Sequence, residues 1–257
     1  MIRRPHCLSL WRELARDKAM IFLSGPRQTG KTTLARTIAE DFYLRWSGTY
    51  HRQIIREDIR NLRALRHAES LEVLFSLLPS KVGSPMSIHG IAQDLETSFH
   101  TVKSWLDLFE SFFLILRLPP WTSRLARAIR KERKPYLLDP AQIVSPAARF
   151  ENLVALELSR AVSNWNDLGL GRFSLHYLRN KEGEEVDFLI ANRNAPMLLI
   201  ETKLAEESAP ASLRKFQDAL GVPAVLLVDK PGIYRTITNG KHRILAATAS
   251  RWVAGLP

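Results

Sequence analysis

The sequence predicts an α/β protein in three parts: a short phosphate-loop βα unit at residues 1–42, a helical middle at residues 43–140, and a C-terminal α-β-β-β-α-β domain at residues 141–257. Two observations predict this class. A glycine-rich turn near the N-terminus separates a short apolar run from a helical pattern, and beyond residue 141 strand-length apolar runs alternate with helical patterns. Between residues 50 and 78 the apolar spacing is helical, so no strand is expected there.

Composition limits the classes of function. The 257 residues are 46% hydrophobic, enough to bury a core, and their formal net charge of +11 attracts anionic partners such as nucleic acid. Cys7 is the only cysteine, so neither an intramolecular disulfide nor a thiolate metal cluster is expected. No signal peptide is recognised, and no apolar run approaches the roughly 20 residues that cross a bilayer. We expect a cytoplasmic protein with no membrane partner, and the sequence leaves oligomer formation open.

The glycine-rich turn matches the Walker A pattern. It follows the apolar run Ala19–Leu23 and opens the helix expected at Lys31–Glu40, as a phosphate-binding loop requires. Backbone N–H groups of such a loop face phosphates, the lysine adds a positive charge, and the next hydroxyl holds Mg²⁺. The alternative is an ordinary turn with a solvated lysine. We expect ATP with Mg²⁺ to be bound by Gly25, Arg27, Gln28, Gly30, Lys31, Thr32 and Thr33.

Hydrolysis of the bound nucleotide is not expected. It needs an acidic residue at the end of a second strand to hold Mg²⁺, and a group that positions water. Asp139 and Asp229 each end an apolar run, but both lie far beyond the loop and neither is followed by a second acid. One strand and one helix between Ala19 and Asp41 are also too few to cover a parallel sheet.

The middle part contains a helix-turn-helix pattern from Ser87 to Leu118. Ser87 is placed to cap the first helix, and Leu114–Leu118 predicts a strand after the second. On the second helix we expect one apolar face, made of Val102, Leu106, Phe109 and Phe113. The outward residues are Thr101, Lys103, Ser104, Asp107 and Glu110; a base-reading helix usually has fewer acids, so packing or protein contact is favoured over DNA contact.

A basic stretch at residues 124–134 is the better candidate for contact with DNA phosphates. Arg124, Arg127, Arg130 and Lys131 fall three or four residues apart and would form one stripe on a helix. The alternative, a solvated face, is equally compatible with this pattern.

The C-terminal part carries residues typical of a metal-dependent nuclease. Glu201 and Lys203 stand two apart in an expected strand, and Asp187 lies in the preceding one. An odd-numbered loop such as Arg193 to Ala195 would place Asp187 opposite Glu201, whereas an even loop would separate them. Glu151, on the preceding helix, would add a third carboxylate.

These side chains predict an oxygen-ligand site for Mg²⁺ or Mn²⁺ at Glu151, Asp187 and Glu201. The catalytic residues would be Asp187, Glu201 and Lys203, with the lysine orienting or activating the attacking water. Lys215 and Gln217 on the next helix are candidate phosphate contacts. The alternative is that the fold is retained for packing or binding and has no catalytic activity.

Several stretches resemble a known family. Gly-Pro-Arg-Gln-Thr-Gly-Lys-Thr-Thr-Leu-Ala, beginning at Gly25, resembles the start of prokaryotic AAA-type ATP-binding proteins that carry a C-terminal domain of unknown function. Similar stretches follow at Tyr50–Leu62, Ser87–Leu118, Phe150–Val154, Glu185–Ile190 and Glu201–Lys203. The resemblance implies an AAA-type ATPase domain, then a winged helix, then a restriction-endonuclease-like domain of the PD-(D/E)XK class. Val186 replaces the proline of that signature.

This chain departs from the family between about Phe42 and Tyr50, where the family would hold most of its ATPase domain. It therefore resembles an internally shortened member with a truncated P-loop segment. We expect an ATP-binding protein with a degenerate ATPase domain that acts as a nucleotide- or nucleic-acid-binding regulatory module. The alternatives are a Mg²⁺-dependent nuclease acting on DNA and a DNA-binding winged-helix adaptor.

Overall fold

The computed structural model describes residues 68–122, 132–205 and 208–256. The chain divides into two units, Met1–Ala64 and Leu65–Pro257, and all described residues belong to the second. The Walker A residues Gly25 to Thr33 and the basic residues 124–131 therefore lie outside the described residues. In the part that the structure describes, no helix is long and apolar enough to cross a membrane.

Helices form the first part of the described chain. They are α4 (Ala68–Leu77), the 3-10 helix η2 (Leu78–Lys81), α5 (Ile88–Asp94) and α6 (Phe99–Ser111). Ser87 and Ser98 begin α5 and α6: their hydroxyl oxygens accept hydrogen bonds from the N–H groups of Gly90 at 3.3 Å and Thr101 at 3.0 Å. The expected cap at Ser87 is thus confirmed. The core of this part includes Leu71, Leu74, Leu78, Val102, Leu106 and Phe109, all buried.

The expected apolar face of α6 is wrong at one position. Phe113 lies beyond the end of the helix, has a positive φ of 53° and is 76% exposed. The strand that follows, β1 (Ile115–Leu118), pairs antiparallel with β2 (Lys134–Leu137). Arg117 on β1 is buried and forms ion pairs with Asp107 and Glu110 of α6, which fixes this strand to the helix.

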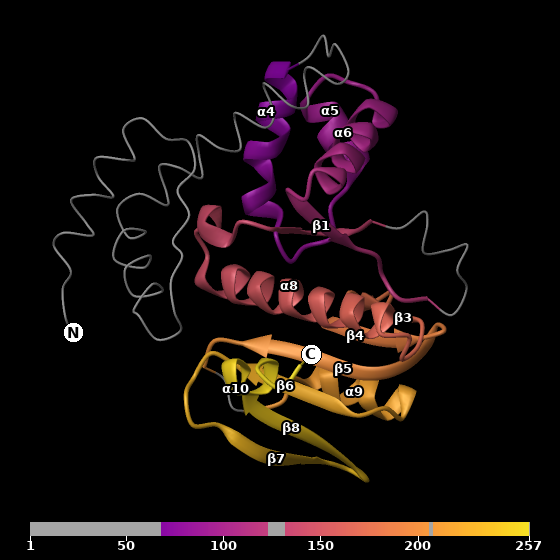
Figure 1. Ribbon diagram of the computed structural model, residues 1–257, viewed down its shortest axis with the longest axis vertical. Helices are drawn as coiled ribbons and strands as arrows, with labels where there is room; N and C mark the ends of the chain where they lie inside the picture. The colour runs from indigo at the N-terminus through magenta and orange to yellow at the C-terminus, as the bar shows by residue number, and fades with distance from the viewer. Residues whose placement is uncertain (1–67, 123–131, 206–207, 257) are drawn as a thin grey trace, which may run out of the picture. The chain divides into compact units, whose positions relative to one another are not determined.

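The second part is a six-stranded mixed sheet of order β3-β4-β5-β6-β8-β7. The strands β3, β4 and β5 are antiparallel neighbours, β5, β6 and β8 are parallel, and β7 returns antiparallel along the edge. The helix α8 lies between the β1–β2 pair and this sheet (Figure 1). The bounds are α8 Pro146–Asp167, β3 Phe173–Arg179, β4 Glu185–Asn192, β5 Ala195–Lys203, α9 Ala211–Leu220, β6 Ala224–Val228, β7 Tyr234–Asn239, β8 His242–Thr248 and α10 Ala249–Val253.

The expected α-β-β-β-α-β order is present as α8-β3-β4-β5-α9-β6. The prediction omitted three elements that follow β6. The strands β7 and β8 and the short helix α10 follow it. A two-residue turn, Gly240-Lys241, joins β7 to β8, and Gly240 has a positive φ of 54°. Asn239-Gly240 is a strong hairpin signal in sequence, so these strands were detectable. The chain is a mixed α/β protein.

The helix α8 is attached to β2 through one buried side chain. The carboxamide of Asn152 accepts a hydrogen bond from the Leu137 N–H at 2.7 Å and donates one to the Leu137 carbonyl at 2.8 Å. It thus satisfies both backbone groups of Leu137, as a neighbouring strand would. A 3-10 helix, η3 (Pro140–Gln142), connects β2 to α8, and Asp139 accepts from the Ala141 N–H at its start.

Candidate functional site

The β4–β5 hairpin brings Asp187 beside Glu201, although not through the expected loop. Its turn is Arg193-Asn194, an even-numbered loop in which both residues have positive φ, of 50° and 67°. By itself this loop would shift the two carboxylates apart. The register changes between Ile190↔Leu198 and Ala191↔Pro196, so Met197 is an extra residue in β5. This bulge restores the pairing, and beyond it Phe188 lies opposite Ile200, one residue from the pair of interest.

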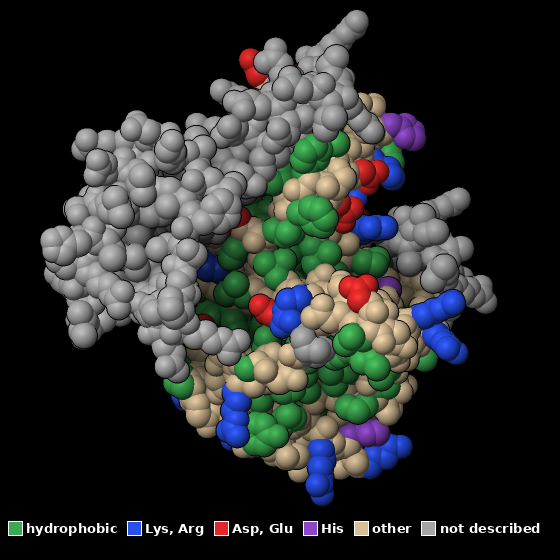
Figure 2. Space-filling view, viewed as in Figure 1, with side chains coloured by type: hydrophobic (Ala, Val, Ile, Leu, Met, Phe, Trp, Pro, Cys, Tyr) green, Lys and Arg blue, Asp and Glu red, His purple; other side chains and the backbone are tan. Residues whose placement is uncertain are grey.

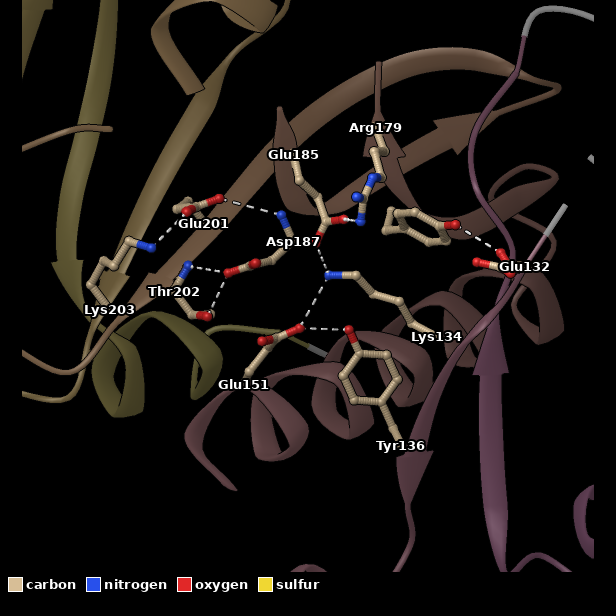
Figure 3. A network of polar contacts seen from close by, with 11 residues as sticks. Glu132, Lys134, Tyr136, Glu151, Arg179, Glu185, Asp187, Glu201, Thr202 and Lys203 are labelled. Atoms are coloured by element: carbon tan, nitrogen blue, oxygen red, sulfur yellow. Dashed lines mark hydrogen bonds and ion pairs between the residues drawn. The ribbon is translucent and has the colours of Figure 1, made fainter. Parts of the chain in front are cut away.

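Asp187, Glu201 and Lys203 are connected through short polar contacts (Figure 3). The Asp187 N–H donates to Glu201 Oε2 at 3.3 Å, and Lys203 Nζ lies 3.0 Å from Glu201 Oε1. The Asp187 carboxylate is held by Thr202, whose N–H and hydroxyl donate to Oδ2 at 2.8 and 2.6 Å. Sequence reasoning did not select Thr202, which fixes the orientation of Asp187.

Glu151 on α8 lies next to this group but is held from the other side. Tyr136 Oη donates to Glu151 Oε1 at 2.7 Å, and Lys134 Nζ lies 3.5 Å from the same oxygen. Both partners come from β2. Gly83 also packs closely: a Cβ there would lie 2.6 Å from Glu151 Oε2. The loop before α5 and the strand β2 therefore help to build the site.

Lys134 corrects one expectation. It was counted in the basic stretch at residues 124–134, yet its side chain is fully buried and is ion-paired with Glu185 and Glu151. A buried ammonium group needs such partners, and it is not available to a DNA phosphate. Lys134, Tyr136 and Glu185 are residues of the site that the sequence motifs did not indicate.

Burial and mutual repulsion disfavour the ionised forms of two carboxyl groups in the site. Burial and the nearby Asp187 carboxylate raise the pKa of Glu151 to about 8, and the same two causes raise the pKa of Glu201 to about 7. Burial opposes the charged form of Lys134, but Glu151, Asp187 and Glu185 together raise its pKa above the ordinary value. A bound cation would favour the ionised carboxylates.

The donor chemistry fits Mg²⁺ or Mn²⁺ at the Asp187–Glu201 pair. Mg²⁺ in proteins is commonly bound through one or two carboxylates and keeps several waters. In the described part of the chain, however, no three His, Cys, Asp or Glu side chains are arranged as metal ligands. Glu151, the expected third ligand, has Oε1 engaged by Tyr136 and Lys134.

A polar cleft of about 590 Å³ lies beside this group. It is lined by Ser84, Pro85, Pro120, Glu132, Tyr177, Arg179 and Asn180. Arg179 Nη1 donates to Glu185 Oε2 at 3.3 Å, and Glu185 pairs in turn with Lys134. The cleft is thus linked to the carboxylates through one arginine and one glutamate.

The other expected contacts with nucleic acid are less favourable. Gln217 is buried and donates to the Arg243 carbonyl, so it cannot reach a phosphate, and Lys215 is paired with Glu184. On α6, Lys103 pairs with Asp107. On the face drawn in Figure 2, the described Lys and Arg side chains are scattered and do not form one broad patch.

Two families match the chain. The first, described as a domain of unknown function (DUF8612), matches residues 21–167. The second, described as a domain of unknown function (DUF4143), matches residues 147–245. The second match agrees with the resemblance to AAA-associated proteins that end in a domain of unknown function. Lys134, Tyr136 and Glu151 all lie within the first match.

A comparison with curated proteins gives no match. One solved structure is similar at 13% identity and a TM-score of 0.32: the half-complex from the tetradecameric assembly of Thermococcus gammatolerans McrB AAA+ hexamers with bound McrC. The match covers 94% of this chain and 60% of that one, so the chain spans less than two thirds of its length. A TM-score of this size does not establish a shared fold.

Proposed function

Because the chain belongs to the family described as domain of unknown function DUF8612, which names no activity, we propose a function from the site itself: divalent-cation-dependent cleavage of phosphodiester bonds in DNA. The observation that carries the proposal is the contact between Asp187, Glu201 and Lys203 on neighbouring strands. Two carboxylates can hold a divalent cation for such hydrolysis, and a lysine beside them can position the attacking water.

Each residue has a proposed role. Asp187 and Glu201 hold Mg²⁺ or Mn²⁺, and Thr202 keeps the Asp187 carboxylate oriented toward the site. When bound, the cation would stabilise negative charge on the phosphodiester. Lys203, 3.0 Å from Glu201, positions the attacking water. Glu151 lies beside this pair, held by Tyr136 and Lys134, and Arg179 contacts a phosphate of the strand that lies in the adjacent cleft.

A nuclease assay tests the proposal. Single- and double-stranded DNA would be incubated with the full chain and Mg²⁺ or Mn²⁺, and the variants Lys203→Ala and Asp187→Asn compared with wild type. Lys241→Ala is the control, since that lysine is exposed in the turn between β7 and β8. We expect cleavage to be lost in both site variants and kept in the control. Equal cleavage by wild type and Lys203→Ala, or none by any protein, would reject the proposal.

A second function, nucleotide binding, is favoured by the Walker A motif. We propose that Gly25, Arg27, Gln28, Gly30, Lys31, Thr32 and Thr33 hold ATP with Mg²⁺ and that the bound nucleotide regulates the chain without being hydrolysed. Binding to the folded state raises its stability, so Mg²⁺-ATP would raise Tm in the wild type and not in Lys31→Ala. Release of inorganic phosphate that depends on Lys31 would show that hydrolysis had been wrongly excluded.

DNA binding without cleavage is the remaining alternative, and the same variants distinguish it. An adaptor predicts an affinity that falls steeply with salt and is unchanged in Lys203→Ala, because counterion release from phosphates does not depend on the catalytic lysine.

A further inference from the structure

One buried lysine of the site comes from outside the sheet. Lys134 lies on β2, has no exposed side-chain surface, and extends toward carboxylates on two other elements (Figure 3). It is ion-paired with Glu185 of β4, and its Nζ lies 3.5 Å from Oε1 of Glu151 on α8. The same Nζ lies 5.3 Å from the centre of the Tyr177 ring.

In this arrangement the Lys134 ammonium group has the place that a metal ion would have between two carboxylates. Two carboxylates from different elements converge on one positive centre, and an aromatic ring borders it. Burial of a single ammonium group is costly unless carboxylates surround it, and burial of the two carboxylates is costly without it. The positive charge of Lys134 is therefore needed between these carboxylates, whereas its aliphatic chain resembles that of other unbranched side chains.

We propose that Lys134 is a resident cation of the site, which holds Glu151 and Glu185 in place of a divalent ion, so that the chain takes one divalent ion, at Asp187 and Glu201, and not two. The single-ion stoichiometry rests on the proposed function, because that function places a cation at the Asp187–Glu201 pair. The role of Lys134 itself rests only on its burial and its two carboxylate partners.

The test uses the full chain and the variant Lys134→Met, which keeps the length of the side chain and removes its charge. Lys215→Met is the control, since Lys215 pairs with Glu184 at the surface. Thermal unfolding would be followed in EDTA and in MnCl₂, and Mn²⁺ binding counted by calorimetry. We expect Lys134→Met to lower Tm by about 10 °C in EDTA, to regain most of that loss in Mn²⁺, and to bind one more Mn²⁺ than wild type. The control should do none of these.

A loss of stability that Mn²⁺ does not reduce, with no additional ion bound, would overturn the proposal. If Lys134→Met does not fold in EDTA, the double variant Lys134→Met/Glu185→Gln decides, because it removes the lysine together with the carboxylate that it contacts directly. If the double variant folds, the result supports a resident cation. If the double variant does not fold, the lysine is needed for packing and not for its charge. If the wild type neither binds Mn²⁺ nor cleaves DNA, the proposed function fails, while a Mn²⁺ site gained by Lys134→Met would still support this inference.

Discussion

Replacing Gly83 with alanine tests whether the Glu151 carboxylate is held as rigidly as its contacts indicate. An added Cβ would lie 2.6 Å from Oε2, 2.9 Å from Oε1 and 2.9 Å from Cδ of that side chain. These distances are too short for any real contact, so Glu151 must move. The Glu151 carboxylate accepts a hydrogen bond from Tyr136 and lies 3.5 Å from Lys134 Nζ. Movement of this carboxylate would weaken both interactions.

The cost has two parts. Gly83 has a φ of +73°, and a non-glycine residue in this region costs about 1–2 kcal/mol. Displacing Glu151 weakens a hydrogen bond to a charged group, at about 1.5–3 kcal/mol. The substitution Gly169→Ala measures the backbone cost alone, because Gly169 has a nearly equal φ of +70° and nothing lies within 4 Å of an added Cβ. Gly83→Ala should therefore cost about 2 kcal/mol more than Gly169→Ala, or about 4–8 °C in Tm.

Thermal unfolding of the two variants in EDTA measures this difference. In a Tyr136→Phe background the extra cost of Gly83→Ala should shrink, because one of the bonds that resist movement of Glu151 is already absent. Equal losses of stability in Gly83→Ala and Gly169→Ala would refute the reasoning, since they would mean that the Glu151 carboxylate is free to move aside.

Three other perturbations test different parts of the chain. Burial and a neighbouring carboxylate raise the pKa of Glu151 to about 8 from an ordinary value of 4.5. Between these two pH values the folded state therefore binds a proton that the unfolded state does not bind. Stability in EDTA should therefore fall as pH rises from 5 to about 8, and Glu151→Gln should flatten a plot of Tm against pH. Arg117→Met should lower the free energy of unfolding, measured in urea, by about 1.5–3 kcal/mol, since it removes the bonds that the buried guanidinium donates to the partly exposed carboxylates of Asp107 and Glu110. Lys103→Met, at an exposed pair, should cost under about 1 kcal/mol, and equal costs would contradict this ion-pair network. Arg179→Ala should weaken binding of fluorescent single-stranded DNA several-fold and reduce its salt dependence, whereas the exposed control Arg160→Ala should leave both unchanged; equal affinities would remove the cleft from the proposed path of the strand.

The elements that bury one face were predictable from sequence, because apolar spacing reports burial. The α-β-β-β-α-β order expected beyond residue 141 is found as α8, β3, β4, β5, α9 and β6. The strand β7 was missed because it lies at the sheet edge with most of its side chains exposed, so its apolar pattern is weak. Only the dipeptide Asn239-Gly240, where β7 meets the turn, marks it in the sequence.

Strand spacing predicted that Glu201 and Lys203 share a face, but the approach of Asp187 to Glu201 was expected through an odd-numbered loop and is achieved by an even turn and a bulge. Residue spacing within a strand does not reveal an extra residue, so the bulge at Met197 could not be inferred. Nor does the count of basic residues distinguish Lys134 from its exposed neighbours, because its burial depends on α8 and β4, which follow later in the chain. The contact of β2 with α8 through Asn152 likewise depends on residues that follow later in the chain.

That contact has a practical consequence for dissecting the protein. A fragment excised at residue 141, where the alternation of helices and strands predicted a domain border, would carry Asn152 and Glu151 but leave behind Leu137, Tyr136 and Lys134. The amide would face solvent with neither backbone partner, and the acidic groups would repel one another without their ammonium neighbour. The C-terminal sheet is thus completed by residues from the preceding segment, and expression trials would do better to retain them.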